Sequence, residues 1–174
     1  MMKFIILFFV LFIFTCASSF AQENSDAKYV TESVSVEGLI EKPMTLTVAS
    51  LKQMKVEQRK NYKITNHEGV VKRKIASFKG VSLREIIKQA TVKMESPKDR
   101  GKFLVVITAS DGYQTTFTYN EIMFNETGNT AFLAFEAEGK PLDQEGKIAL
   151  YTTADTATGP RHVRWVQKIE VRKI

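Results

Sequence analysis

The sequence predicts an α+β domain that is mainly β, with mixed sheets and two or three short helices. Three observations support this class. About nine segments have the apolar or alternating pattern of strands, turn residues separate many of them, and helical spacing is confined to short stretches. The chain has 174 residues, enough for one ordinary domain. A domain of this size can bury a core without disulfides.

The first half of the chain predicts strands, one short helix and a hairpin. Val30 to Leu39 alternates between apolar and polar residues, which predicts a strand, and Met44 to Val48 predicts a second one. Ser50 to Met54 follows as a short helix. Residues 55–76 are rich in Lys and Arg, but apolar residues punctuate them. They therefore predict a hairpin, which turns near residues 66–69.

The second half predicts one capped helix and then mostly strands. Ser82 and Glu85 have the spacing of a capping box, and apolar residues follow at helical spacing, so we expect a helix over residues 83–91. The remaining predicted segments are a central strand Phe103–Thr108, a turn at Asp111-Gly112, a strand Gln114–Tyr119, a helical turn Asn120–Phe124, and strands Ala131–Phe135, Lys147–Thr152 and His162–Arg172.

Residues 1–21 have the pattern of a signal peptide. Lys3 supplies a positive charge, Phe4 to Phe14 is an unbroken apolar run, and small residues precede a predicted cleavage between Ala21 and Gln22. We therefore expect a periplasmic or secreted protein. In the alternative, a lipoprotein anchored through Cys16, the chain would also meet a membrane. Residues 22–33 are expected to be a flexible lead-in, and residues 34–174 the folded domain.

Charge and cysteine content narrow the function classes. Cys16 is the only cysteine, so the cleaved chain would have no disulfide, thiol nucleophile or thiolate metal ligand. Cleavage leaves 24 basic against 19 acidic residues, a net charge of +5. We read this mild excess, including Lys72-Arg73-Lys74, as solvated surface, and expect no nucleic-acid partner. We also read His67 and the Asp111-Gly112-Tyr113 turn as structural.

Several segments resemble the molybdopterin-binding domain of the sulfite oxidase family. Gly139-Lys140-Pro141-Leu142 matches its "Gly-x-x-Leu" turn, and residues 159–165 match its "Gly-Ala-Arg-x-Val-Lys-Trp" strand. Residues 78–87 are similar to its "Gly-Val-x-Leu-x-x-Leu-Leu" helix, and residues 109–113 to an "Ala-x-Asp-Gly-Tyr" turn of small bacterial relatives. No single motif is specific, but their order and spacing together are. The resemblance covers residues 34–174 and implies the sulfite oxidase-type fold.

The residues that hold the cofactor in this family are missing. The resemblance implies one cysteine thiolate on molybdenum, and the matching window, residues 48–74, has no cysteine. Glu145 stands where the family has a His, and Leu150 where it has an Arg, two residues that hold the pterin phosphate. A carboxylate repels a phosphate, and Leu offers no donor.

The segment that survives is Arg161-His162-Val163-Arg164, which lines the pterin in the family. Because three donors close together suit an anion, Arg161, His162 and Arg164 are the candidate binding side chains. The competing interpretation is an outer strand with a solvated row of charges. On strand alternation, Val163, Trp165 and Gln167 would share the core face.

Three functions remain open. The preferred one is an exported, non-catalytic module with this fold that binds a small anionic ligand or an envelope protein, with no cofactor and no metal. The second is a molybdopterin-dependent oxidoreductase with atypical metal ligation. The third is a structural accessory subunit without a small ligand, which pairs through exposed strand edges.

Overall fold

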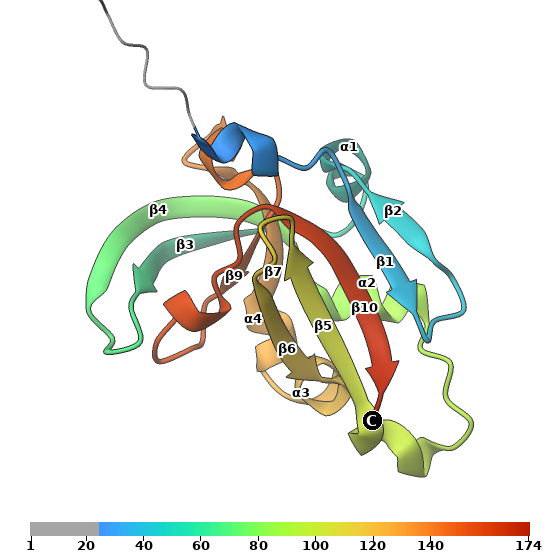
Figure 1. Ribbon diagram of the computed structural model, residues 1–174. Coiled ribbons are helices and arrows are strands. Elements are labelled where there is room, and N and C mark those ends of the chain that lie inside the picture. Colours follow the sequence, from blue (N-terminus) through green and yellow to red (C-terminus); the bar gives the residue numbers. More distant parts are fainter. Residues whose placement is uncertain (1–24) are drawn as a thin grey trace, which may run out of the picture.

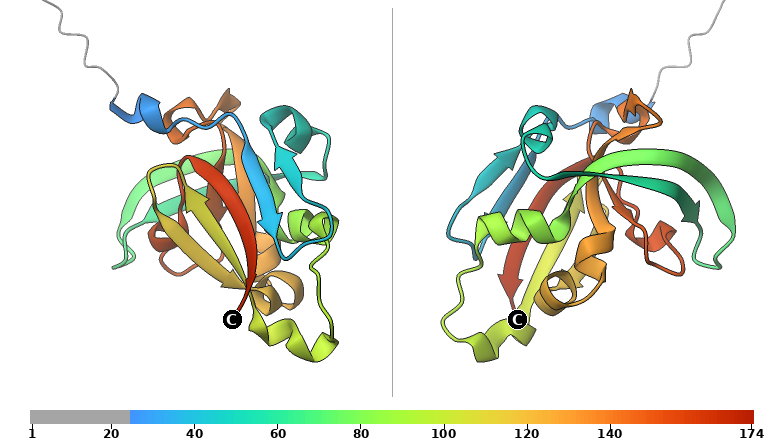
Figure 2. Two further views of the ribbon diagram at one scale, coloured as in Figure 1. Left: turned by 45° about the vertical axis from the view of Figure 1, so that its right-hand side comes forward. Right: turned by 180° about the vertical axis from the view of Figure 1, so that it is seen from behind.

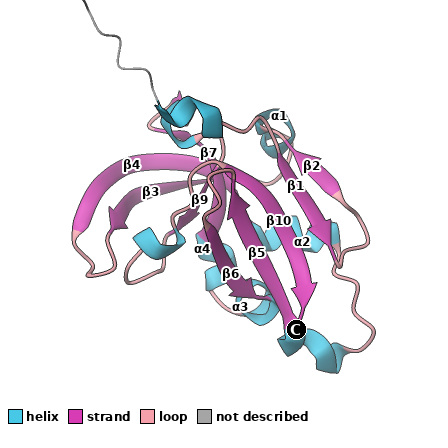
Figure 3. Ribbon diagram, viewed as in Figure 1, coloured by secondary structure: helices cyan, strands magenta, loops and turns pink. Residues whose placement is uncertain are grey.

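The computed structural model describes residues 25–174, which form two β-sheets with short helices packed around them (Figures 1 and 3). The first sheet has the order β2 (Met44–Leu46), β1 (Val34–Gly38), β10 (Val166–Lys173), β5 (Phe103–Ala109) and β6 (Gln114–Thr118). The second has the order β3 (Val56–Thr65), β4 (Val71–Ser82), β7 (Ala131–Ala137) and β8 (Lys140–Pro141), and β9 (Ala149–Thr152) also pairs with β7. β1 and β10 are parallel and the other pairs antiparallel, so the predicted mixed, mainly β class is confirmed.

The helices are short, and side-chain caps begin three of them. They are α1 (Val48–Lys52), α2 (Leu83–Ala90), α3 (Tyr119–Phe124) and α4 (Thr127–Thr130), with 3₁₀ turns at Ser25–Tyr29, Pro97–Lys102, Asp143–Glu145 and Gly159–Arg161. The predicted start of α2 is confirmed, because the Ser82 hydroxyl accepts a hydrogen bond from the backbone N–H of Glu85. Within residues 25–174, no helix is long and apolar enough to cross a bilayer.

Two hydrophobic clusters lie on the two faces of the second sheet. Along β7, Leu133 and Phe135 point into the larger cluster, which the first sheet and α2 complete, whereas Phe132 and Ala134 belong to a smaller one. This alternation follows from the two-residue period of a strand. Because β7 is buried on both faces, its sequence is continuously apolar from Ala131 to Phe135.

The β3–β4 hairpin covers the smaller cluster. The hairpin was predicted, and it is longer than expected, because β4 continues to Ser82 and pairs with β7. It leaves the body as a curved arm whose tip lies away from the first sheet (Figures 1 and 2). Tyr62 and Ile75 are opposite each other in the hairpin and are both buried, so the arm closes over the outer face of the second sheet.

The last strand begins later than predicted. β10 starts at Val166 rather than His162, because Trp165 has a left-handed backbone with φ of 52° and the pairing register shifts between Val166 and Lys168. The predicted alternation is therefore wrong at this point: Trp165 and Val166 are both buried, and Gln167 is exposed. A left-handed residue turns two successive side chains toward the same face.

Residues 25–33, part of the lead-in that the sequence predicts to be flexible, contact the body of the domain. The ring of Tyr29 lies 5.3 Å from that of Trp165, and the Thr31 hydroxyl donates to the carbonyl of Val166 at 2.8 Å. Ser110 donates to the Tyr29 carbonyl. Residues 22–24, the predicted signal peptide and Cys16 lie outside the described residues.

Candidate functional site

A buried carboxylate, Glu145, is the centre of a polar network that includes three other side chains. It ends the 3₁₀ turn Asp143–Glu145, and only 3% of its side chain is exposed. Its Oε1 accepts a hydrogen bond from Arg73 at 2.5 Å, and its Oε2 contacts the Tyr151 hydroxyl and His162 Nε2, each at 2.9 Å. Its backbone carbonyl accepts from the N–H of Trp165. Glu145 thus joins β4, β9 and the segment before β10.

The charge of Glu145 is stabilised in place. Burial alone would raise the pKa of its carboxyl, but the hydrogen bond and charge of His162, aided by Tyr151 and Arg73, hold that pKa below its ordinary value of 4.5. An ionised carboxylate only accepts hydrogen bonds, so His162 must carry a proton on Nε2. The carboxylate therefore sets which nitrogen of His162 is protonated and how the ring is oriented.

Aromatic rings pack beside this network. Tyr151 stacks on Tyr62 at 4.8 Å between ring centres, and it meets the edges of Phe78 and His162 at 5.1 and 5.2 Å. Burial raises the pKa of Tyr62 to about 12, and burial beside Glu145 raises the pKa of Tyr151. Both phenols therefore stay protonated at neutral pH, and Tyr151 acts as a hydrogen-bond donor to the carboxylate.

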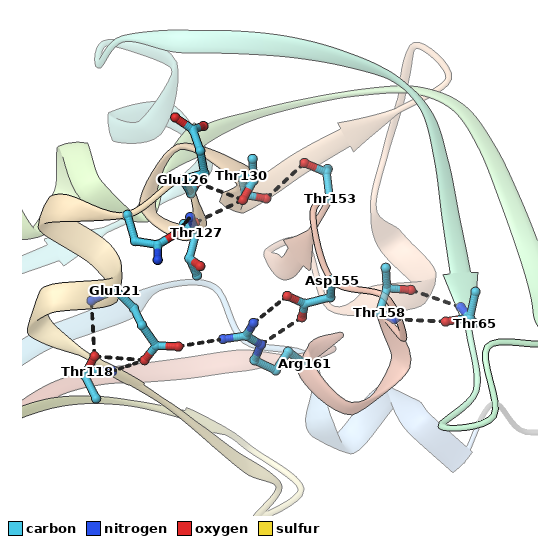
Figure 4. A network of polar contacts seen from close by, with 11 residues as sticks. Thr65, Thr118, Glu121, Glu126, Thr127, Thr130, Thr153, Asp155, Thr158 and Arg161 are labelled. Carbon is cyan, nitrogen blue, oxygen red and sulfur yellow. Dashed lines mark hydrogen bonds and ion pairs between the residues drawn. The ribbon is translucent and has the colours of Figure 1, made fainter.

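Arg161 points away from this network. Its guanidinium contacts both carboxylate oxygens of Asp155, with Nε–Oδ2 at 2.8 Å, and approaches Glu121 Oε1 at 3.7 Å (Figure 4). It also lies 4.6 Å above the ring of Phe117. Glu121 in turn caps α3 by accepting from the N–H of Thr118. Arg161 therefore connects its own loop to α3, and its donors are occupied by carboxylates of the chain.

The loop before Arg161 is tied to the end of β3. The backbone N–H of Thr65 donates to the Thr158 hydroxyl at 3.0 Å, and the N–H of Thr158 donates to the Thr65 hydroxyl at 2.9 Å (Figure 4). The next residue, Gly159, touches the same strand, because a Cβ added there would lie 2.0 Å from the Thr65 carbonyl oxygen. Only glycine fits this contact without moving backbone.

Gly159→Ala is expected to lower the free energy of unfolding by about 1–3 kcal/mol, because the added methyl forces the loop off β3. Urea denaturation followed by circular dichroism measures the change. Gly101→Ala is the control, because no atom lies within 3.8 Å of the Cβ that it adds. Gly69→Ala is unsuitable, because Gly69 has a left-handed backbone with φ of 80°, which strains any other residue. Equal stability of the Gly159 and Gly101 variants would show that the loop does not touch β3.

His162 and Arg164 line one pocket of about 240 Å³, together with Asp111, Tyr113 and Gly159. The Nδ1 of His162 has no hydrogen-bond partner among the described residues, and its Nε2 is held by Glu145. Arg164 lies 3.9 Å above the Trp165 ring, and its Nη1 is 3.6 Å from the half-exposed Asp26 carboxylate. Asp111 accepts from the N–H of Tyr113, and the Tyr113 hydroxyl donates to the Pro160 carbonyl. The arrangement offers an anion the guanidinium of Arg164, and a second donor at His162 Nδ1 when both ring nitrogens are protonated, beside the carboxylate of Asp111.

Glu145 and Leu150, the two positions at which the resemblance implies His and Arg, lie in different surroundings. Leu150 is fully buried in the larger cluster, and its backbone exchanges hydrogen bonds with Val163, which is also buried there. Val163 therefore contributes packing and backbone contacts. Glu145 points to the other face of the second sheet, where it meets Arg73 and His162.

The structure thus divides the predicted site. It brings His162 and Arg164 to one pocket, turns Arg161 toward Asp155, and buries Val163. Sequence reasoning missed Arg73, Tyr151 and Asp155 as partners. Arg73 was read as part of a solvated charge run, and its partner lies 72 residues away. In the sequence, the only sign of this network was Glu145, an acid at a position where the resemblance implies a His.

Comparisons with known proteins agree with this fold. The family model of the oxidoreductase molybdopterin binding domain matches residues 22–174. Among solved structures, the chain is similar to the sulfane dehydrogenase SoxCD from Paracoccus pantotrophus, with a TM-score of 0.61 and 20% sequence identity. The match covers 84% of this chain and 39% of that one, and at this identity it shows the fold alone. No curated protein matches the sequence. Because the family model spans nearly the whole sequence, the chain belongs to the oxidoreductase molybdopterin binding domain family.

Proposed function

We propose that this protein is an exported, non-catalytic module that keeps the fold of its family and works by binding. The observation that carries this proposal is the buried Glu145 carboxylate, which His162, Tyr151 and Arg73 satisfy from within the chain. By the resemblance, the family places a phosphate-binding His at this position. Here the protein supplies its own anion, and the surrounding donors are used by it.

The donors in residues 25–174 do not suit the cofactor of the family. This part of the sequence has no cysteine to bind molybdenum, and it has no cluster of three or more His, Asp or Glu side chains placed to hold a metal ion. A pocket of about 330 Å³ adjoins Glu145, and the charged side chains that line it are three carboxylates and two cations: Glu138, Asp143, Glu145, Arg73 and Lys140. Such a lining does not favour a phosphate.

Protein isolated from the envelope of its native host tests the absence of the cofactor. We expect far less than one molybdenum per chain by mass spectrometry of the metal, and no pterin fluorescence after oxidation. Molybdenum and pterin at one per chain would overturn the proposal in favour of an oxidoreductase with atypical ligation.

We further propose that the pocket of His162 and Arg164 binds a small oxyanion. Arg164 is only weakly paired, since Asp26 is 3.6 Å away and both side chains are nearly half exposed, so a ligand can displace this carboxylate. Glu145 accepts from Nε2 and holds His162 in one orientation from behind, and Nδ1 donates to an oxyanion when the ring carries a proton on both nitrogens. A small anion would be held between the two basic side chains, with Gly159 at the pocket wall and the Asp111 carboxylate turned to the backbone N–H of Tyr113.

Arg164→Ala is expected to weaken binding of sulfate by about 10- to 100-fold, because a charge-assisted hydrogen bond is lost. Titration calorimetry measures the affinity. Arg172→Ala, which removes a similarly exposed guanidinium outside the pocket, is the matched control and should bind like the wild type. The sequence suggested Arg161 as a third member of this site. Because the structure turns Arg161 away from the pocket, Arg161→Ala should leave the affinity for sulfate unchanged. If sulfate binding is absent or indifferent to Arg164, the accessory-subunit function is favoured.

A further inference from the structure

The β3–β4 hairpin, residues 56–82, carries nearly all the net charge of the protein. It contains seven Lys and Arg residues against two Glu residues, a net +5, whereas the whole sequence has +6. Three of these cations are paired with carboxylates: Arg59 with Glu57, Arg73 with Glu145 and Lys79 with Glu136. The other four are exposed and form no ion pair with the described residues: Lys60, Lys63, Lys72 and Lys74.

Two of these four lysines weaken the pairing of the hairpin strands, and all four lack an ion-pair partner among the described residues. Lys63 and Lys74 are directly opposite each other in the β3–β4 register. Like charges at such a position repel and weaken the strand pair. No carboxylate among the described residues offsets this repulsion by an ion pair. Charges that cost stability and are left unpaired are best explained by a partner outside the chain.

The tip of the hairpin combines these charges with exposed apolar surface. Val70 is 51% and Val71 41% exposed, and Lys72 follows directly. The tip also projects from the body on the curved arm (Figures 1 and 2), and residues 67–74 are all exposed. Lysine side chains can extend to anionic headgroups while valines beside them enter the interfacial layer of a bilayer.

We infer that this hairpin is a docking surface for a bilayer that contains anionic phospholipids. The inference uses only the export part of the proposed function, and it needs no lipid on Cys16. A nucleic acid is less suited, because Tyr62 and Phe78, the aromatic residues of the hairpin, are buried and cannot stack on bases. The exposed valines likewise have no role on a polyanion.

Co-sedimentation of the cleaved chain with vesicles tests the inference. We expect binding to vesicles of phosphatidylglycerol and phosphatidylcholine, weak binding to pure phosphatidylcholine, and loss of binding as salt rises. Replacing the four unpaired lysines of the hairpin with Gln should lower the partition coefficient by about 5-fold per residue. Val70→Ser with Val71→Ser should lower it further at high salt.

The matched control replaces four exposed lysines elsewhere with Gln: Lys42, Lys88, Lys93 and Lys98. It removes the same charge and should bind nearly like the wild type. An equal loss in both quadruple variants, or no binding to anionic vesicles, overturns the inference. Tight binding to duplex DNA or polyglutamate that does not depend on the valines overturns it in favour of another polyanion. Vesicle binding is independent of molybdenum content, so this inference and the non-catalytic proposal can fail separately.

Discussion

Glu145→Ala is expected to lower the free energy of unfolding by about 3–5 kcal/mol, because it removes one member of a buried charge network and leaves the others unpaired. His162 loses the acceptor of Nε2, and the buried hydroxyl of Tyr151 loses its only acceptor among the described residues. Urea denaturation followed by far-ultraviolet circular dichroism measures the loss. Glu95→Ala removes an exposed carboxylate and should change stability by less than about 0.5 kcal/mol.

A double-mutant cycle distinguishes a network from ordinary packing. If Glu145 and His162 interact as the structure shows, the double variant Glu145→Ala with His162→Ala should cost less than the sum of the two single variants, by about 0.5–3 kcal/mol. Strict additivity would mean that the two side chains do not share their stabilisation. The same cycle with the exposed His67 in place of His162 should be additive.

The pH dependence of stability gives a second check on the charge of Glu145. Its pKa in the folded state lies below the ordinary value of 4.5, so its carboxylate binds fewer protons when the chain is folded. The resulting stability is fully present above pH 4.5 and is lost as the pH falls through the lower, folded-state pKa. The difference in free energy of unfolding between the wild type and Glu145→Gln should therefore shrink only below pH 4.5. A difference that stays constant down to the acid limit of folding would contradict an ionised Glu145.

The fold was predictable because local patterns and long-range structure agree over most of the chain. Ser82 caps α2 as its spacing with Glu85 predicts, and the apolar run of β7 reflects burial on both faces. Pattern reasoning failed at Trp165, where the left-handed backbone interrupts the two-residue period. Strand alternation assumes extended residues throughout, so it assigned Gln167 to the core face, whereas this residue is exposed.

The site was less predictable, since its contacts join residues that are far apart. Arg73 and Glu145 are separated by 72 residues, and no local spacing connects them. Arg161 and Asp155 are only six residues apart, but an irregular loop sets their approach. The resemblance to the family identified Glu145 and Leu150 as substituted positions. It could not show that Leu150 joins the core while Glu145 becomes the centre of a charge network.

Trp165→Ala is expected to lower the free energy of unfolding by about 3–5 kcal/mol, because removing a buried aromatic side chain creates a cavity that its neighbours cannot fill. Trp165 is 3% exposed, and its ring lies against Tyr29 and beneath Arg164. Trp165 is the only tryptophan, so the variant loses its fluorescence signal and circular dichroism must report unfolding. Phe124→Ala, at a position 64% exposed, is the matched aromatic control and should change stability little.

Gly146 provides the test that the Trp165 ring sits where the structure places it. A Cβ at Gly146 would lie 2.2 Å from Trp165 Cδ1 and 3.0 Å from its Cα, and the backbone has φ of 81°. Gly146→Ala should therefore be destabilising in the wild type through both the ring contact and the backbone strain. In the Trp165→Ala background the ring contact is gone, so the same change should cost less, although the strain remains. An equal cost in both backgrounds would place the ring elsewhere, and the link from Trp165 through its N–H to the Glu145 carbonyl would then lose its support.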